Sequence, residues 1–464
     1  MLHYMKSKPN LTRSAFLSAL LFLMTACTKN FVSTPPDSSL LIPKSISDCQ
    51  GLLDNDEVMN GYGNSGYPSL GEVGCDDYYV SKSQFVSYSP TIQQAVTWSK
   101  AFYFDSTAPD WDLPYRTVLY SNVALDALSK TSKDPLSAWN NAYASALYFR
   151  AFAFYSLSQI FCASYDSSTA TSDWGLPLRM QADVNEKLTR SKMADTYGRI
   201  ILDLKNALSV PSPDFPMAPP QHATRPSKAA CYGLLARVFL SARNYAKALA
   251  YSDSCLQISS NLMQYDTITA TSPFPFRRNN PEVIFLAAYY GQGPSQNYLS
   301  YVDSSLVGSY MNGDLRKKLF FTSDKYFVGR YDESGYSFCG LAADEMYLTR
   351  AECYARSGDK DKAMNDLNYL LNARWMKNSF VPLTAIDTKD ALFKILSERR
   401  KELLFRGLRW TDLRRLNKDS VTSISLTRNV NGQNYYLSPN DPKYVYPIPQ
   451  TVIAFNPGMP QNDR

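Results

Sequence analysis

The chain has 464 residues, enough for one large domain or two to three ordinary ones. Hydrophobic residues make up 45% and charged residues 19%, which is typical of a folded globular protein and excludes a disordered one. The net charge of +6 falls to +3 without residues 1–26, which hold three basic residues and no acidic one, so the charge gives no support to nucleic-acid binding.

The first 26 residues have the organisation of a secretory signal peptide. Lys6 and Arg13 precede the apolar run "SAFLSALLFLM", which is too short to span a bilayer, and "TAC" places small residues before Cys27. This end resembles a bacterial lipobox, in which the cysteine becomes the lipidated first residue. The polar, Pro-rich residues 27–45 then suit a flexible tether. The alternative is an ordinary signal peptide followed by an unrelated cysteine.

The remaining seven cysteines are scattered, odd in number and without a CxxC pair, which favours neither a zinc site nor a disulfide framework. Several fall on apolar faces of expected helices, where a thiol packs as a small hydrophobe. No metal or cofactor site is expected. The seven are Cys49, Cys75, Cys162, Cys231, Cys255, Cys339 and Cys353.

Helical signals dominate two blocks, about 110–260 and 341–416. In the first block, helices are expected from Pro114, from Met193, and after Asp134, which would be an N-cap with Pro135 at the first helical position. Irregular sequence covers about 60–109, 261–340 and 417–464, and such long stretches in a compact domain are usually functional or mobile. We therefore expect a mainly α fold in a single domain, residues 46–464.

Two distant segments share one pattern, at Cys231 and at Glu345. Ala236 and Phe239 in the first match Ala351 and Tyr354 in the second, and each segment has another alanine twelve residues after the first, Ala248 and Ala363. Small alanines let two helices approach closely while the aromatic ring fills the groove between them. The pattern resembles tetratricopeptide-like helical hairpins.

Sequence features of catalysis are weak. Only His3 and His222 exist, and the motifs of metalloproteases, nucleotide-binding loops and serine hydrolases are absent from the sequence. A pair of carboxylates, as in glycosidases, has no spacing rule and stays open. Asp76–Asp77 is one such pair, but neighbouring residues of an extended chain point to opposite sides. We expect a protein that is not an enzyme.

The segment "ERRKELLFRGLRWTDLRRL" (398–416) predicts a helix, a break at Gly407 and a second short helix. Leu403, Leu404, Phe405, Leu408 and Leu413 should face inward. Trp410 should lie in the core or contact a repeat, and the arginines should form ion pairs with Glu398, Glu402 and Asp412. The segment resembles the signature of the SusD/RagB family of outer-membrane lipoproteins, with Arg406 where that family usually has glutamate. The residues that carry this resemblance are Glu398, Arg399, Glu402, Leu403, Phe405, Gly407, Arg409, Trp410, Asp412, Leu413 and Arg415.

Three other features match the same family. The tail "YPIPQTVIAFNPGMPQND", the helix ending in Phe161-Cys162 before "WGLPL", and the lipobox all resemble it. The resemblance implies a SusD-like fold with a loop-rich ligand-binding half. It also implies a lipid-anchored protein of the outer membrane, facing the extracellular side, that delivers a nutrient to a SusC-like TonB-dependent β-barrel transporter. The ligand would most often be an oligosaccharide and sometimes a peptide.

Candidate ligand contacts come from composition, because the ligand residues of the family vary too much to carry over. Sugars stack on aromatic rings and bond to polar side chains. Trp111 is excluded, because the family tends to place a structural tryptophan there. The candidates are Asp77, Tyr78, Tyr79, Trp98, Tyr289, Tyr290 and Tyr298, and packing in the core is at least as common a role for each.

Four hypotheses of function remain open at this point. They are glycan capture for uptake, peptide capture on the same scaffold, a surface glycosidase with unrecognised carboxylates, and an envelope scaffold that binds no ligand. A panel of oligosaccharides and peptides separates the first two. Release of reducing ends would identify a glycosidase, and a scaffold should bind no small molecule.

Overall fold

The computed structural model describes residues 43–211, 223–269, 273–295, 301–333 and 335–464. Residues Lys44–Arg464 form one compact unit. The expected signal peptide, Cys27 and nearly all of the tether lie outside the described residues, as do His222 and Tyr298. Among the helices of the described residues, none is long and apolar enough to cross a membrane.

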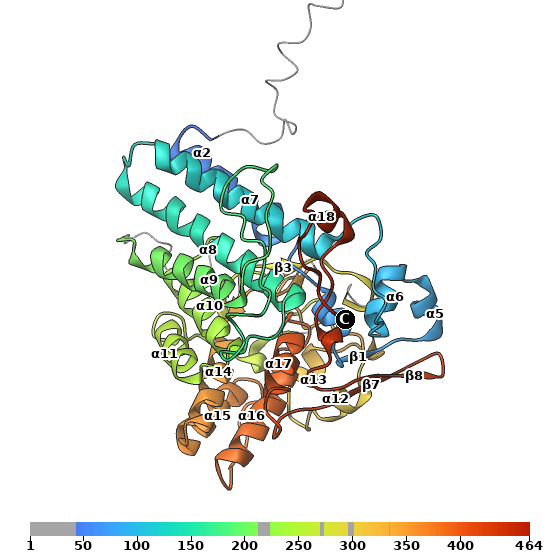
Figure 1. Ribbon diagram of the computed structural model, residues 1–464. Helices are drawn as coiled ribbons and strands as arrows, with labels where there is room; N and C mark the ends of the chain where they lie inside the picture. Colours follow the sequence, from blue (N-terminus) through green and yellow to red (C-terminus); the bar gives the residue numbers. More distant parts are fainter. Residues whose placement is uncertain (1–42, 212–222, 270–272, 296–300, 334) are drawn as a thin grey trace, which may run out of the picture. The chain divides into compact units, whose positions relative to one another are not determined.

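The described chain is mainly helical, which confirms the predicted fold class (Figure 1). Its helices are α2 (Ile46–Leu53), α3 (Asp56–Asn60), α4 (Leu70–Gly74), α5 (Lys82–Ser87), α6 (Pro90–Val96), α7 (Pro109–Lys130), α8 (Leu136–Phe161), α9 (Met193–Ser209), α10 (Lys228–Ser241), α11 (Tyr245–Leu256), α12 (Ser304–Gly308), α13 (Arg316–Leu319), α14 (Ala343–Arg356), α15 (Lys360–Asn372), α16 (Thr388–Glu402), α17 (Arg409–Leu416) and α18 (Gln450–Phe455). Its strands are β1 (Tyr78–Tyr79), β2 (Val283–Phe285), β3 (Ala288–Tyr289), β4 (Tyr301–Val302), β5 (Ser337–Phe338), β6 (Leu341–Ala342), β7 (Leu426–Val430) and β8 (Gln433–Leu437).

The two predicted helical hairpins are α10–α11 and α14–α15, and α11 also packs on α14, so the hairpins lie side by side (Figure 1). Ala236, Ala248, Ala351 and Ala363 are completely buried at the contacts. Phe239 is buried too, and its ring stacks on Tyr251 at a centroid distance of 5.5 Å. The shared alanine pattern thus marks close helix packing, as the sequence predicted.

Two helix starts differ from the prediction. Helix α8 begins at Leu136 with Pro135 as its N-cap, so Asp134, the predicted N-cap, lies one residue before the observed cap. Helix α7 begins at Pro109, and Pro114 lies inside it. Either Pro109 or Pro114 suits a helix start, because the missing N–H and the fixed φ of a proline cost little there. Pro109 occupies that position. The early start places Trp111 in the first turn of α7.

Residues 398–416 fold as predicted. Helix α16 ends at Glu402, Gly407 adopts a φ of +74° that favours glycine, and α17 follows. Trp410 is fully buried. Arg406, the departure from the family signature, is buried and pairs with Asp344. The five predicted inward-facing residues, Leu403, Leu404, Phe405, Leu408 and Leu413, are all buried.

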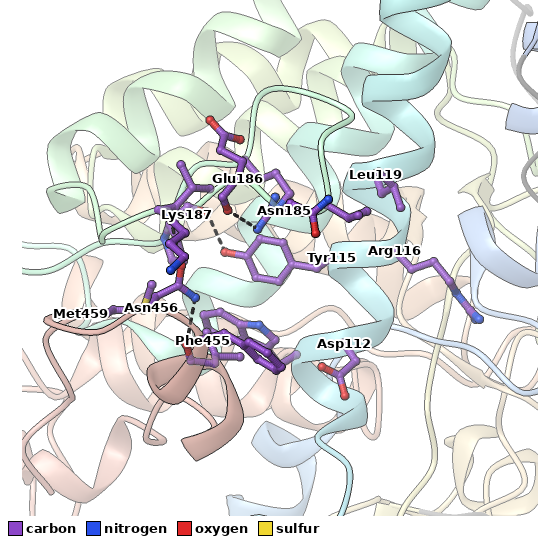
Figure 2. A pocket seen from close by; sticks show the side chains of 16 residues that line it. Asp112, Tyr115, Arg116, Leu119, Asn185, Glu186, Lys187, Phe455, Asn456 and Met459 are labelled. Atoms are coloured by element: carbon purple, nitrogen blue, oxygen red, sulfur yellow. Dashed lines mark hydrogen bonds between the residues drawn. The ribbon is translucent and has the colours of Figure 1, made fainter. Parts of the chain in front are cut away.

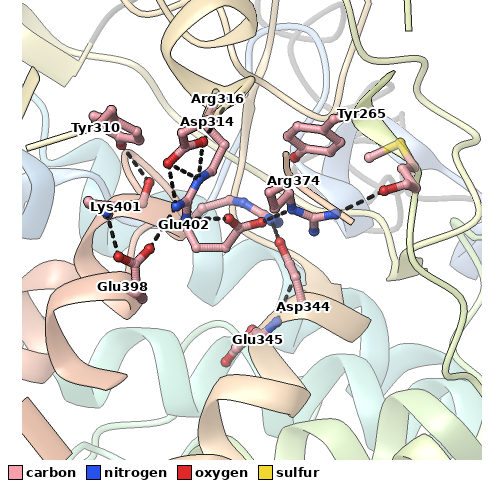
Figure 3. A network of polar contacts seen from close by, with 12 residues as sticks. Tyr265, Tyr310, Asp314, Arg316, Asp344, Glu345, Arg374, Glu398, Lys401 and Glu402 are labelled. Atoms are coloured by element: carbon pink, nitrogen blue, oxygen red, sulfur yellow. Dashed lines mark hydrogen bonds and ion pairs between the residues drawn. The ribbon is translucent and has the colours of Figure 1, made fainter. Parts of the chain in front are cut away.

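A buried network of ion pairs joins this segment to the middle of the chain (Figure 3). Arg316 pairs with Glu398 at 2.7 Å and with Glu402 at 3.0 Å. Arg374 pairs with Glu402 at 2.7 Å and with Glu282 at 2.8 Å. Each guanidinium offers several donors in a fixed plane, so one arginine can satisfy two buried carboxylates. The basic and acidic side chains of the segment therefore form the inner wall of the domain.

Short antiparallel strand pairs bring the irregular segments together. The pairs are β1–β4, β2–β6, β3–β5 and β7–β8. The β7–β8 hairpin turns at Asn431 and Gly432, which both have positive φ, as a tight two-residue hairpin turn requires. Residues 417–464 are predicted to be irregular, although the Asn-Gly dipeptide between alternating residues is a hairpin signal.

Candidate functional site

Four of the predicted ligand contacts instead lie in the core. Asp77 and Trp98 are 1% and 2% exposed. The Asp77 carboxylate accepts a hydrogen bond from Arg400 Nε at 2.8 Å, and the Trp98 indole donates to the Gly74 carbonyl at 2.8 Å. Both polar groups are therefore used inside the protein.

Tyr78 and Tyr289 are buried in the same way. The Tyr78 hydroxyl donates to the Val73 carbonyl, and the Tyr289 hydroxyl donates to the Phe405 carbonyl at 3.3 Å. Burial raises the pKa of both hydroxyls, so both stay protonated donors. None of these four side chains offers a free face to a ligand at the surface.

Tyr79 is the predicted contact that reaches the surface, with 42% of the residue exposed. It pairs with Tyr301 across β1 and β4, and Tyr301 forms a bridge with Tyr326 on its other side. Side chains at directly paired positions of neighbouring strands point to the same face. The pairing therefore places three tyrosines in one row, which we call the tyrosine ladder.

The rings of the tyrosine ladder are stacked. The Tyr79 and Tyr301 centroids lie 5.0 Å apart with an interplanar angle of 11°, and the Tyr301 and Tyr326 centroids lie 4.9 Å apart at 28°. Carbon atoms in contact are about 3.5–4.0 Å apart, so each ring must be displaced sideways from the next. Part of each ring face and the hydroxyl ends therefore lie clear of the neighbouring ring. A hydrogen bond between the side chains of Tyr301 and Tyr326 raises the pKa of the Tyr326 hydroxyl.

The buried side of β1 holds the tyrosine ladder in place. Strand residues alternate between the two faces, so Tyr78 points inward where Tyr79 points outward. The Arg428 guanidinium lies between two rings, 4.5 Å from the Tyr78 centroid and 4.7 Å from the Trp98 centroid. Arg428 belongs to β7, so the hairpin and the strand of the ladder share one buried contact. Two of the predicted contacts, Tyr78 and Trp98, thus support the ladder from below.

Tyr290 lines a separate polar cavity of about 440 Å³ with Tyr88 and Gln292. Asp110 also lines it, and this carboxylate accepts hydrogen bonds from the Ser69 and Leu70 amides and from Gln292. Burial raises the pKa of Asp110 to about 6. Because these bonds tie α4 to α7, the polar groups of this cavity serve mainly to join two helices.

Another cavity has a volume of about 730 Å³ and lies between α7, the loop 177–188 and α18 (Figure 2). Trp111, Tyr115 and Phe455 supply aromatic rings to it. The Tyr115 hydroxyl donates to the Pro177 carbonyl at 2.8 Å, and Asn456 accepts from the Leu188 amide at 3.1 Å. The loop is thus fastened to both helices. We call this cavity the α7–α18 cavity.

Trp111 has two roles here. Its ring packs on Tyr115 and Phe161, and the residue is only 5% exposed. Trp111 therefore belongs to the core, which agrees with its predicted structural role. Its ring nevertheless lines the α7–α18 cavity.

One buried group of side chains has the composition of a metal site. Ligand atoms of Glu72, Cys75 and Asp77 lie within 4.8 Å of one another, and no other such group occurs in the described parts of the chain. Burial, followed by the charge of Asp77, raises the pKa of Glu72 to about 8. Arg400 already compensates Asp77. With the Glu72 carboxyl protonated and the Cys75 thiol kept neutral by burial, two of the three groups are not in the ionised form in which they would bind a metal.

The sequence matches two family models. Residues 30–240 match a family described as starch-binding and associating with the outer membrane, and residues 343–464 match the family described as the SusD family. The chain belongs to the SusD family. A comparison with curated proteins finds no match.

Solved structures of SusD proteins share this fold. A putative sugar binding protein from Bacteroides vulgatus is 21% identical, with 91% of this chain and 99% of that chain covered and a TM-score of 0.71. SusD superfamily proteins from Bacteroides fragilis and Bacteroides thetaiotaomicron are 19% and 18% identical, each with 90% of this chain and 100% of the other covered, at TM-scores of 0.73 and 0.72. The SusD fold predicted from the sequence motifs is confirmed.

Proposed function

We propose that this SusD-family protein captures a carbohydrate on the tyrosine ladder and breaks no bond in it. The observation that carries the proposal is the placing of Tyr79, Tyr301 and Tyr326 at paired positions, where their rings stack in one row that is exposed at Tyr79 and half-buried at Tyr301 and Tyr326. Sugar rings present apolar C–H faces and hydroxyls, which suit such a row. The starch-binding description of the matching family supports the same ligand class.

The ladder suits binding more than catalysis. Its three side chains are phenols, and the row holds no carboxylate or imidazole, which are the usual general bases. Asp76 and Asp77, which directly precede β1, are engaged with Arg400. These features support a role in which the ligand is held and passed on unchanged.

We further propose that the protein is anchored by lipid at Cys27, faces the extracellular side of the outer membrane and passes its ligand to a SusC-like TonB-dependent transporter. The signal-peptide pattern, the polar tether and the family match support this placement. A C-terminally tagged protein, purified from outer membranes in mild detergent, should bring with it a large β-barrel in comparable amount. Its absence, with the protein intact and membrane-bound, would favour a free-standing binder or a scaffold.

The ligand is tested by calorimetric titration with gluco-, xylo-, manno- and galacto-oligosaccharides and with oligopeptides of similar length. Tyr301→Ala removes the middle ring and both of its stacking contacts, and should weaken the best oligosaccharide about tenfold. Tyr369→Ala is the matched control, because Tyr369 is 57% exposed on α15 and outside the ladder. Unchanged affinity in Tyr301→Ala would refute the ladder as the site.

The same titrations decide between the other hypotheses. Binding of peptides in place of sugars would identify a peptide-capturing SusD protein, and release of reducing ends would identify a glycosidase. A failure of every probe to bind would favour an envelope scaffold.

A further inference from the structure

The α7–α18 cavity has the features of a preformed binding site separate from the tyrosine ladder. Its volume of about 730 Å³ falls within the range of about 300–1,000 Å³ that is usual for small-ligand sites. It shares no residue with the ladder, since it is built from α7, the loop 177–188 and α18. Its walls are held by the hydrogen bonds of Tyr115 and Asn456 to the loop backbone.

Two large apolar side chains at this cavity remain uncovered. Phe455 is 77% exposed and Val184 is 58% exposed, although both line the cavity. Helix α18 buries none of its own residues, so packing within the domain does not explain why it carries a phenylalanine at its end. An occupant of the cavity would take these apolar surfaces out of water, which favours binding.

The polar side chains of the cavity fit hydroxyl groups. Asp112 is an acceptor, Lys187 is a donor, and the Asn185 amide is both. Within the described residues, the side chains of Asn185 and Lys187 make no hydrogen bond, and Asp112 accepts only one, from the Ala108 amide at 3.2 Å. A hydroxyl both donates and accepts, so it can pair with any of the three. Figure 2 shows these polar groups on different sides of the Tyr115 and Phe455 rings.

We infer that the α7–α18 cavity is a second carbohydrate site, in which a sugar ring stacks on Tyr115 or Phe455 and bonds through its hydroxyls to Asp112, Asn185 and Lys187. The inference rests on the proposed function for the ligand class, but on separate residues. A protein with both the tyrosine ladder and the α7–α18 cavity can bind one long glycan at two points, or two short glycans separately. Two linked contacts raise the affinity for a long glycan above that of either site alone.

Hydroxyl-radical footprinting of the full chain reads the cavity directly. The probe is maltoheptaose, followed by the best oligosaccharide of the titration panel. Oxidation of Phe455 should fall when the probe saturates the protein. Phe393, 43% exposed on α16, is the matched control and should keep its rate. The protection of Phe455 should persist in Tyr301→Ala, because the ladder contributes no residue to the cavity.

Variants complete the test. Phe455→Ala should remove one bound ligand per chain in native mass spectrometry, and should weaken a short probe about tenfold in the Tyr301→Ala background. Phe393→Ala should change neither the number of bound ligands nor the affinity for the short probe. Suppose that carbohydrate binds, that Phe455 keeps its oxidation rate, and that Phe455→Ala binds the ligand as the wild type does. This result would overturn the cavity site and would not affect the proposal for the tyrosine ladder. Failure of every sugar to bind would overturn both proposals.

Discussion

Glu72 should make the stability of this protein fall as the pH rises. The side chain is 2% exposed in α4, and one of its carboxylate oxygens has no partner among the described residues. Burial raises its pKa from an ordinary value of 4.5 to about 8. The folded state therefore holds this proton more tightly than the unfolded state does. The stability is fully present below pH 4.5 and is lost as the pH rises through about 8.

The size of the effect follows from the separation of the two pKa values, about 3.5 pH units. Each unit corresponds to about 1.4 kcal/mol, so ionisation should cost the folded state about 5 kcal/mol by pH 8. Other buried acids also contribute, since the pKa of Glu282 is raised to about 7. A comparison with Glu72→Gln isolates Glu72, because glutamine keeps the shape and cannot ionise.

The measurement is urea unfolding of both proteins at pH 5, 6, 7 and 8. The advantage of Glu72→Gln over the wild type should be under about 1 kcal/mol at pH 5 and grow by about 1.4 kcal/mol per pH unit. Glu57→Gln, an exposed change on α3, controls for the loss of one acidic group. Parallel curves for the wild type and Glu72→Gln would show that Glu72 is already ionised in the fold, and the reasoning would fail.

Three further predictions concern the frame and the anchor. Arg374→Met should lower the unfolding free energy by about 3–5 kcal/mol, since it leaves Glu282 buried without its cation; a loss under about 1 kcal/mol in urea would contradict this. Gly61→Ala should lower the melting temperature, because φ is +82° and the added Cβ would lie 2.3 Å from the Ala288 carbonyl oxygen, whereas Gly51→Ala meets no atom within 4 Å. Cys27→Ser should release the protein from membrane fractions, and continued membrane binding would exclude a lipid at Cys27.

The helical frame could be predicted because its signals are local. The alanines of the two hairpins recur at helical spacing within single segments, and their burial follows from that spacing. The break at Gly407 is marked by one residue type, because its φ is positive. The SusD family could be named from motifs for the same reason. Near prolines the observed helix boundaries differ from the predicted ones by a few residues, as at Pro114, because more than one residue suits a helix start.

The candidate site could be predicted only in part, because it depends on pairing between distant segments. Tyr79 and Tyr301 are more than 200 residues apart in the sequence, and their strands are two residues long, too short for a period of two to show. Composition gave Tyr78 and Tyr79 equal weight, although strand alternation buries one and exposes the other. No local pattern marks Phe455 or the cavity, because the cavity is formed by three segments that lie far apart in the sequence.

The seven described thiols have a consequence for how this protein can be studied. All are buried and unpaired, and burial raises the pKa of Cys231 and Cys255 above the ordinary value. A buried, protonated thiol reacts very slowly with alkylating reagents, and reacts fast once its surroundings open. Cys49 in α2, Cys162 after α8 and Cys353 in α14 belong to different parts of the frame. The mass added per chain over time would therefore show which parts open first, with no engineered label.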